Sequence, residues 1–151
     1  MGRLVLLEDE ELAPGSEANV QILLEEQAGC WPGDKYVVRS YSPIYTIGGG
    51  VIFNGSPRKR KRFRQENKQV FQTYRENIPE NIAQLHIKEN GYNGLTLNRL
   101  AVKMGIYGNR IKKIVQHPLS SRNLILIEQD KQRMVEETVY KKLSEKLCSV
   151  L

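Results

Sequence analysis

The chain has 151 residues, and its 23 lysines and arginines outnumber its 17 aspartates and glutamates, which gives a net charge of +6. That length allows one domain or two small ones. A hydrophobic fraction of 40% and a charged fraction of 26% exclude a fully disordered or fibrous chain. No apolar run approaches the ~20 residues that span a membrane, and no secretory signal is recognised. With two distant cysteines, Cys30 and Cys148, we expect a reduced cytoplasmic protein without a membrane partner.

The charge is divided unevenly along the chain. Residues 1–56 contain three basic and eight acidic residues, whereas residues 57–151 contain twenty basic and nine acidic ones. The first part therefore has a net charge of −5 and the second a net charge of +11. Such an asymmetry indicates two modules, one of which meets a polyanion.

Residues 1–56 have the pattern of short β-strands separated by turns that contain glycine and proline. The expected strands lie at residues 3–7, 18–24, 35–40 and 45–53. In the second of them, Val20, Ile22 and Leu24 share one face. Four strands are few for a closed barrel, and an open barrel exposes strand edges. We therefore expect an incomplete β-barrel segment from a larger domain, with strand edges open to self-association.

After Pro57 the hydrophobic spacing becomes helical. Residues 57–77 combine a basic linker with a helix. Residues 78–136 have the order helix, helix, turn, helix and β-hairpin, which is typical of a winged helix, and Thr96 is placed to cap the second helix. A last helix over residues 137–151 is expected to lead to a further module. The predicted fold is mixed: a partial β-barrel, then an α+β winged-helix domain and a C-terminal helix.

Helix boundaries and core positions follow from the same pattern. The third helix is expected from about residue 109 to Gln116, ending before Pro118. The residues expected on the buried face of the second helix are Leu97, Leu100, Ala101 and Met104.

Catalytic and metal sites are poorly supported by the sequence. It contains no P-loop, G-x-S-x-G or H-E-x-x-H pattern. We interpret the histidines, His86 and His117, as packed or helix-terminal residues, and Cys30 as a buried small hydrophobe. The acidic run at residues 8–11 is interpreted as a solvated loop. We expect no enzyme activity, no cofactor and no metal site in this chain.

Three glycines, Gly48, Gly49 and Gly50, interrupt the fourth strand pattern. They do not form a dinucleotide fingerprint, which needs a helix to follow. Either the strand bends sharply at a barrel corner, or another backbone approaches closely. The bend is favoured; the close approach would allow a nucleic-acid backbone to lie against the sheet.

The basic run over residues 58–64 is the strongest electrostatic feature, with six positive charges in seven positions. Three interpretations are open: a solvated linker, a nuclear-localisation type of signal, or a segment that binds phosphate groups. In the last case the affinity for nucleic acid falls as the salt concentration rises. The candidate RNA-binding residues within it are Arg58, Lys59, Arg60, Lys61, Arg62 and Arg64. Weaker candidates on the expected third helix, which reads the groove in DNA-binding relatives, are Arg110, Lys112 and Lys113.

An ordered set of motifs within residues 4–64 resembles the third domain of a translational GTPase of the elongation factor Tu type. The motifs are LAPG at 12–15, VQILLEE at 20–26, WPGDKYVVRS at 31–40 and TIGGGVI at 46–52. The Thr-Ile-Gly-Gly-Gly form, followed by a proline and a basic stretch, more specifically resembles the bacterial selenocysteine-specific translation elongation factor. Residues 78–136 are similar to that family only in fold pattern.

The resemblance implies delivery of selenocysteyl-tRNA to the ribosome at recoded UGA codons. It implies that Arg39 and residues 48–50 belong to the surface that faces tRNA. It also implies that the GTPase domain, with its GTP and magnesium, and the module that grips the mRNA hairpin lie outside this chain. The winged-helix module would then space the GTPase core from the mRNA-binding modules.

The alternative hypothesis is a DNA-binding winged-helix transcription regulator with a small β-domain. The motif set between Arg39 and Gly50 favours the translation factor, because a transcription regulator has no reason to carry it. A third interpretation, compatible with the first, treats the winged helix as an inert spacer.

Overall fold

The structure is a computed structural model that describes residues 1–148. The chain divides into two compact units, Met1–Lys68 and Gln69–Leu151, and α1 (Gln65–Glu76) contains the division. Within the described residues the fold is mixed, with five α-helices and small antiparallel sheets. The sheets of this described part do not close into a barrel.

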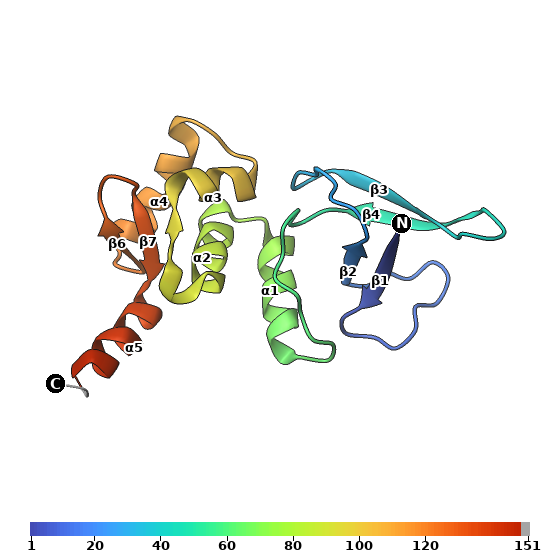
Figure 1. The fold of residues 1–151 in the computed structure, drawn as a ribbon, viewed down its shortest axis with the longest axis horizontal. Coiled ribbons are helices and arrows are strands. Elements are labelled where there is room, and N and C mark those ends of the chain that lie inside the picture. The colour runs from blue at the N-terminus through green and yellow to red at the C-terminus, as the bar shows by residue number, and fades with distance from the viewer. Residues whose placement is uncertain (149–151) are drawn as a thin grey trace. The chain divides into compact units, whose positions relative to one another are not determined.

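The first unit contains two separate antiparallel hairpins (Figure 1). β1 (Gly2–Leu6) pairs with β2 (Val20–Leu24), and β3 (Lys35–Arg39) pairs with β4 (Thr46–Val51). Strands therefore lie at all the expected positions. Their edges have no further strand partner among the described residues.

The first unit has little apolar core of its own. Among the described residues 1–64, Leu7 is the hydrophobic side chain that is fully buried, with 1% exposure. Exposed hydrophobic side chains on the hairpins are Leu4, Ile22, Leu24, Val37, Ile47 and Val51. Isolated two-stranded hairpins are marginally stable in water. The unit therefore depends on contacts other than those within its two hairpins.

The apolar face of the second strand is not the covered one. Ile22 and Leu24 are exposed, and Gln21 between the apolar positions is the buried residue, with 8% exposure. Side chains along β2 still alternate between two faces. The covered face is the one that carries Gln21, because residues 58–60 bind to it.

The second unit is built around a three-stranded antiparallel sheet of order β5-β7-β6, of which β6 and β7 are labelled in Figure 1. Its elements in chain order are α2 (Pro79–Glu89), the 3-10 helix η1 (Gly91–Asn93), β5 (Leu95–Thr96), α3 (Leu97–Met104), α4 (Asn109–Ser120), β6 (Leu124–Glu128), β7 (Arg133–Glu136) and α5 (Glu137–Cys148). The last three residues of the helix expected over 137–151 lie outside the described residues.

Local signals explain where these helices begin and end. Pro79 occupies the first turn of α2, where its missing N–H is not needed. The Thr96 hydroxyl accepts a hydrogen bond from the Arg99 amide at 3.4 Å, which confirms the predicted cap of α3. Gly105 ends α3 in the left-handed conformation, with φ of 64°.

The expected end of α4 is wrong. The helix continues through the buried Pro118 to Ser120 instead of stopping at Gln116. Pro118 sits in the last turn, so it removes one helical bond near the end, and the amide of Ser121 still donates to the carbonyl of His117 at 2.9 Å.

One apolar cluster forms the core of the second unit. It joins all the helices from α2 to α4 to the sheet. Its members are Ala83, Ile87, Leu95, Leu97, Leu100, Ala101, Met104, Ile111, Val115, Leu124 and Met134. The predicted buried face of α3 is therefore confirmed.

His86 on α2 is buried in this unit, with 2% exposure. Neither ring nitrogen has a hydrogen-bond partner in the described part of the chain, and the ring centroid lies 6.1 Å from that of Tyr74. Burial, with a smaller contribution from the nearby charge of Lys103, lowers the pKa of His86 from 6.5 to about 4. The ring is therefore neutral in the folded protein at neutral pH, as a packed histidine should be.

This histidine makes stability dependent on pH. Between pH 6.5 and about 4 the unfolded chain binds a proton on His86 that the folded chain excludes, so stability falls as pH falls through that window. A pKa difference of this size corresponds to roughly 3 kcal/mol. We expect His86→Leu to flatten this fall, measured as the urea midpoint of the second unit at about pH 7.5 and about pH 4.5. His117→Leu, at an exposed position, is the control, and an equal pH dependence in both variants would contradict the assignment.

Candidate nucleic-acid interface

Residues 58–64, hereafter the basic segment, are bound to the β1–β2 hairpin. The side-chain amide of Gln21 donates from Nε2 to the carbonyl of Arg58 at 2.9 Å. It accepts at Oε1 from the backbone amide of Arg60 at 3.0 Å. One buried glutamine thus holds the backbone on both sides of Lys59.

Two further contacts hold the other end of the basic segment. The backbone amide of Phe63 donates to the carbonyl of Leu7 at 2.8 Å. Asn67, with 2% exposure, donates from Nδ2 to the carbonyl of Lys61 at 2.9 Å. A buried side-chain amide raises the free energy of the folded state unless it is hydrogen-bonded. The buried amides of Gln21 and Asn67 therefore both favour the bound position of the basic segment.

Arg62 differs from its neighbours because its guanidinium group binds the protein itself. Nε donates to the carbonyl of Leu6 at 3.0 Å, and Nη2 donates to the carbonyl of Asp9 at 2.9 Å. The guanidinium carbon also lies 4.7 Å from the centroid of the Phe63 ring. Arg62 is therefore placed to anchor the basic segment.

Most of the remaining charges of the basic segment are exposed to solvent. Arg60 is half-buried, and the exposed basic residues besides Arg62 are Arg58, Lys59, Lys61 and Arg64. None of these four takes part in an ion pair within the described residues. A row of exposed cations on a fixed backbone can bind phosphate groups without reading base sequence.

Arg39 and the three glycines come together on the other hairpin. Arg39 ends β3 exposed to solvent and pairs with Thr46, whereas Val38 pairs with Gly48, so the ladder is irregular between them. A Cβ at Gly49 would lie 2.5 Å from the carbonyl oxygen of Tyr36, which is too close. The close approach is therefore made by the partner strand of the same hairpin.

The three glycines are not equivalent. A Cβ at Gly50 would lie 2.7 Å from the Tyr36 hydroxyl, whereas a Cβ at Gly48 would meet nothing within 4 Å. Gly49 and Gly50 are thus explained by the β3–β4 pairing. Beside Gly48 there is open space on β4, next to the point where the β3–β4 register shifts between Val38 and Arg39.

The weaker candidates lie on α4 in the second unit. Arg110, Lys112 and Lys113 are exposed, while Ile111 and Val115 on the opposite face of the helix are buried. Residues 90–127 contain no acidic residue. The face of α4 is therefore cationic.

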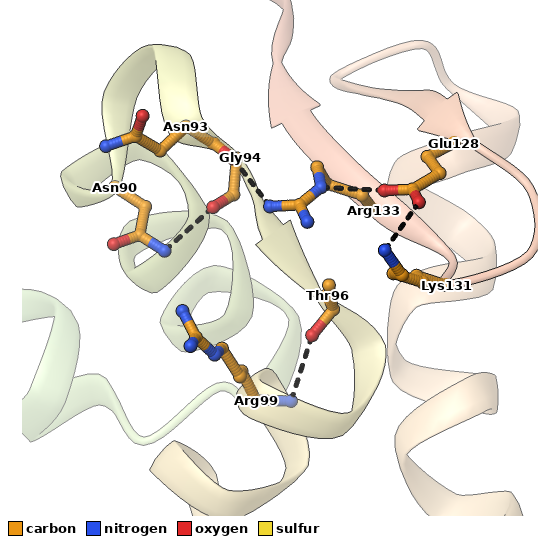
Figure 2. A network of polar contacts seen from close by, with 8 residues as sticks. All are labelled: Asn90, Asn93, Gly94, Thr96, Arg99, Glu128, Lys131 and Arg133. Atoms are coloured by element: carbon orange, nitrogen blue, oxygen red, sulfur yellow. Dashed lines mark hydrogen bonds and ion pairs between the residues drawn. The ribbon is translucent and has the colours of Figure 1, made fainter.

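The basic residues of the β6–β7 hairpin take part in a polar network around one carboxylate (Figure 2). Glu128 pairs with Arg133 at 2.9 Å and with Lys131 at 3.3 Å. Arg133 also donates to the carbonyl of Asn93 at 3.0 Å, which links β7 to η1. The hydrogen bond from Arg133 lowers the pKa of Glu128, so this carboxylate stays charged. The hairpin, with two basic and three acidic residues over 124–136, therefore presents no excess of positive charge.

Both cysteines are free, and Cys30 is half-buried instead of fully buried as expected. Within residues 1–148 no cluster of three or more histidine, cysteine, aspartate or glutamate side chains could hold a metal ion. No helix in the same residues is long and apolar enough to cross a membrane.

Gln21 and Asn67 are the residues that sequence reasoning missed. Each is a polar side chain that the fold buries, and its partner is a backbone group. A glutamine between apolar strand residues was the available signal for Gln21, but its partners lie 37 and 39 residues away.

Comparison with known proteins gives one informative match. No family model matches the chain, and no solved structure matches it. The selenocysteine-specific elongation factor of Desulfomicrobium baculatum is similar to it, with 27% identity over 116 residues. The match covers 77% of this chain and 18% of the relative, so the chain spans less than a fifth of that protein's length.

The glycine geometry predicts a difference between two alanine substitutions. Gly49→Ala places Cβ against the Tyr36 carbonyl at 2.5 Å and should destabilise the β3–β4 hairpin by about 1–3 kcal/mol. Gly48→Ala has room for its methyl group and should leave the hairpin intact. Amide hydrogen exchange of residues 35–51 measures this directly. Equal protection in the two variants would show that the β3–β4 register is not as described.

Proposed function

We propose that this chain is an RNA-facing part of a selenocysteine-specific translation elongation factor, which contacts selenocysteyl-tRNA and works on the ribosome. The observation that carries the proposal is the match to a factor of that name over 77% of the chain. The exposed cations of the basic segment also support the proposal, because they can bind the phosphate groups of RNA. The chain itself supplies RNA contacts, and GTP and magnesium would belong to another part of such a factor.

Under this proposal the first unit is a β-barrel segment like the third domain of elongation factor Tu. Its exposed apolar side chains and open strand edges support an incomplete barrel, because such surfaces are normally covered. The second unit is a winged helix. Its order of helix, strand, two helices and hairpin, with a β5-β7-β6 sheet, supports that assignment.

RNA would be held mainly by phosphate contacts from the basic segment, with Arg39 and the open backbone at Gly48 as additional contacts. Each phosphate that a lysine or arginine neutralises releases counterions, so binding weakens as salt rises. The winged helix would act chiefly as a spacer that connects the RNA-facing unit to modules that bind the mRNA hairpin.

A second candidate function is DNA binding through α4. The exposed side chains of Arg110, Lys112 and Lys113, and the lack of acidic residues over 90–127, favour it. Binding of a DNA duplex in preference to a tRNA transcript would support this candidate against the translation factor.

The proposal predicts which cations bind tRNA. Replacing Arg58, Lys59, Lys61 and Arg64 with alanine should weaken binding of a selenocysteine tRNA transcript and flatten its salt dependence. Each lost phosphate contact should lower the log–log salt slope by ~0.7–0.9, which is measurable by fluorescence anisotropy over ~50–200 mM salt. Arg62 is left unchanged because its guanidinium binds backbone carbonyls.

The matched control replaces Arg110, Lys112 and Lys113 on α4 with alanine, and it should affect tRNA binding less. If the α4 variant loses affinity while the variant of the basic segment keeps its slope, the order of the two sites is reversed.

The chain should also fail to hydrolyse GTP. Its sequence contains no P-loop to bind the phosphates. Turnover measured with the purified protein should equal that of buffer alone, with and without Mg²⁺. GTP hydrolysis in proportion to a titratable binding site would overturn this expectation.

A further inference from the structure

We propose that Gln21 is a positioning residue that makes the basic segment a preformed phosphate-binding edge of the β1–β2 hairpin. Its amide binds the carbonyl of Arg58 and the amide of Arg60, and it leaves Lys59 between them exposed. The phosphate-binding part of this inference rests on the proposed function, whereas the docking of the segment does not.

The two hydrogen bonds of Gln21 imitate a strand. In a parallel ladder, one residue donates to the carbonyl that precedes a partner residue and accepts from the amide that follows it. The side-chain amide makes these two bonds around Lys59, at 2.9 and 3.0 Å. The segment is thereby attached to β2 by a side chain in place of a backbone, and its basic side chains need not enter a sheet.

Burial makes this attachment hard to release. Gln21 is 8% exposed, and both polar atoms of its amide have partners in the basic segment. If the segment left, these atoms would lose their partners in a site shielded from water. The bonds from Phe63, Asn67 and Arg62 fix the following residues in the same way.

Docking opposes the usual behaviour of a basic run. Adjacent like charges repel and normally keep such a run extended and mobile. Here the backbone is ordered before any ligand arrives, so less conformational entropy is lost when phosphates bind. Gln21 should therefore raise affinity for RNA without changing the number of phosphates contacted.

Limited trypsin digestion of the full chain tests the docking without RNA. Trypsin cleaves after lysine and arginine, and cleavage of a docked segment requires local opening. Gln21→Met keeps the side-chain length and removes both hydrogen bonds, so cleavage within residues 58–61 should become about tenfold faster. The control is Gln27→Met, at an exposed glutamine of the same unit, which should cleave like the unmodified protein. Equal cleavage of Gln21→Met and the unmodified protein would overturn the docking role.

A second variant guards against general unfolding of the hairpin. Gln21→Glu keeps the acceptor for the amide of Arg60 and loses the donor to the carbonyl of Arg58. Its cleavage rate should therefore lie between those of the unmodified protein and Gln21→Met. Hydrogen exchange of β1 and β2 should remain protected in this variant. Rapid exchange throughout both strands would assign Gln21 to general stability and overturn the specific positioning role.

Binding of the tRNA transcript then separates positioning from charge. Gln21→Met should weaken binding severalfold at each salt concentration and leave the log–log slope unchanged, whereas removal of basic side chains lowers the slope. Faster cleavage of Gln21→Met together with no tRNA binding by the unmodified protein would overturn the proposed function and leave the docking intact. Faster cleavage with unchanged tRNA affinity would overturn the positioning role alone.

Discussion

The first unit depends on hydrogen bonds between buried side-chain amides and the backbone of a cationic segment. Gln21 and Asn67 are buried polar residues in a unit whose apolar core is small. Their partners are the carbonyls of Arg58 and Lys61 and the amide of Arg60. These bonds hold a strongly basic segment against the polar face of the β1–β2 hairpin, which would otherwise be uncovered. The contacts that stabilise the first unit therefore also fix the position of its positive charges.

The second unit is stabilised by a different kind of interaction. Its helices and sheet share one apolar cluster, which includes Ile87, Leu100 and Met134. Its polar contacts link neighbouring elements: Arg133 joins β7 to η1 through the Asn93 carbonyl and forms an ion pair with Glu128. On α4, by contrast, Arg110 and Lys113 are exposed, and residues 90–127 contain no acidic residue.

Local features of this fold could be predicted from the sequence. The cap by Thr96, the buried face of α3 and the positions of the strands each follow from residues close in sequence. The end of α4 could not, because a buried Pro118 is tolerated in the last turn. The alternation along β2 could be predicted, but not which of its faces is covered, because residues 58–60, far along the chain, bind the face of Gln21.

The candidate site shows the same limit. Composition identifies residues 58–64 as basic, but it cannot separate the exposed Lys59 from Arg62, whose guanidinium binds two backbone carbonyls. That distinction depends on contacts with Leu6 and Asp9, more than fifty residues away in the sequence. Side-chain roles within a charged run are decided by tertiary structure, although the charge itself is visible at once.

The position of Arg39 has a consequence for how the protein behaves in solution. β3 pairs with β4 along one edge and has no strand partner along its other edge within the described residues, and exposed apolar residues such as Val37 lie along it. Lys35 and Arg39 place a positive charge at each end of that strand. Charges on edge strands act as gatekeepers against strand-to-strand aggregation. A neutral residue at position 39 would therefore change colloidal stability as well as any contact with RNA.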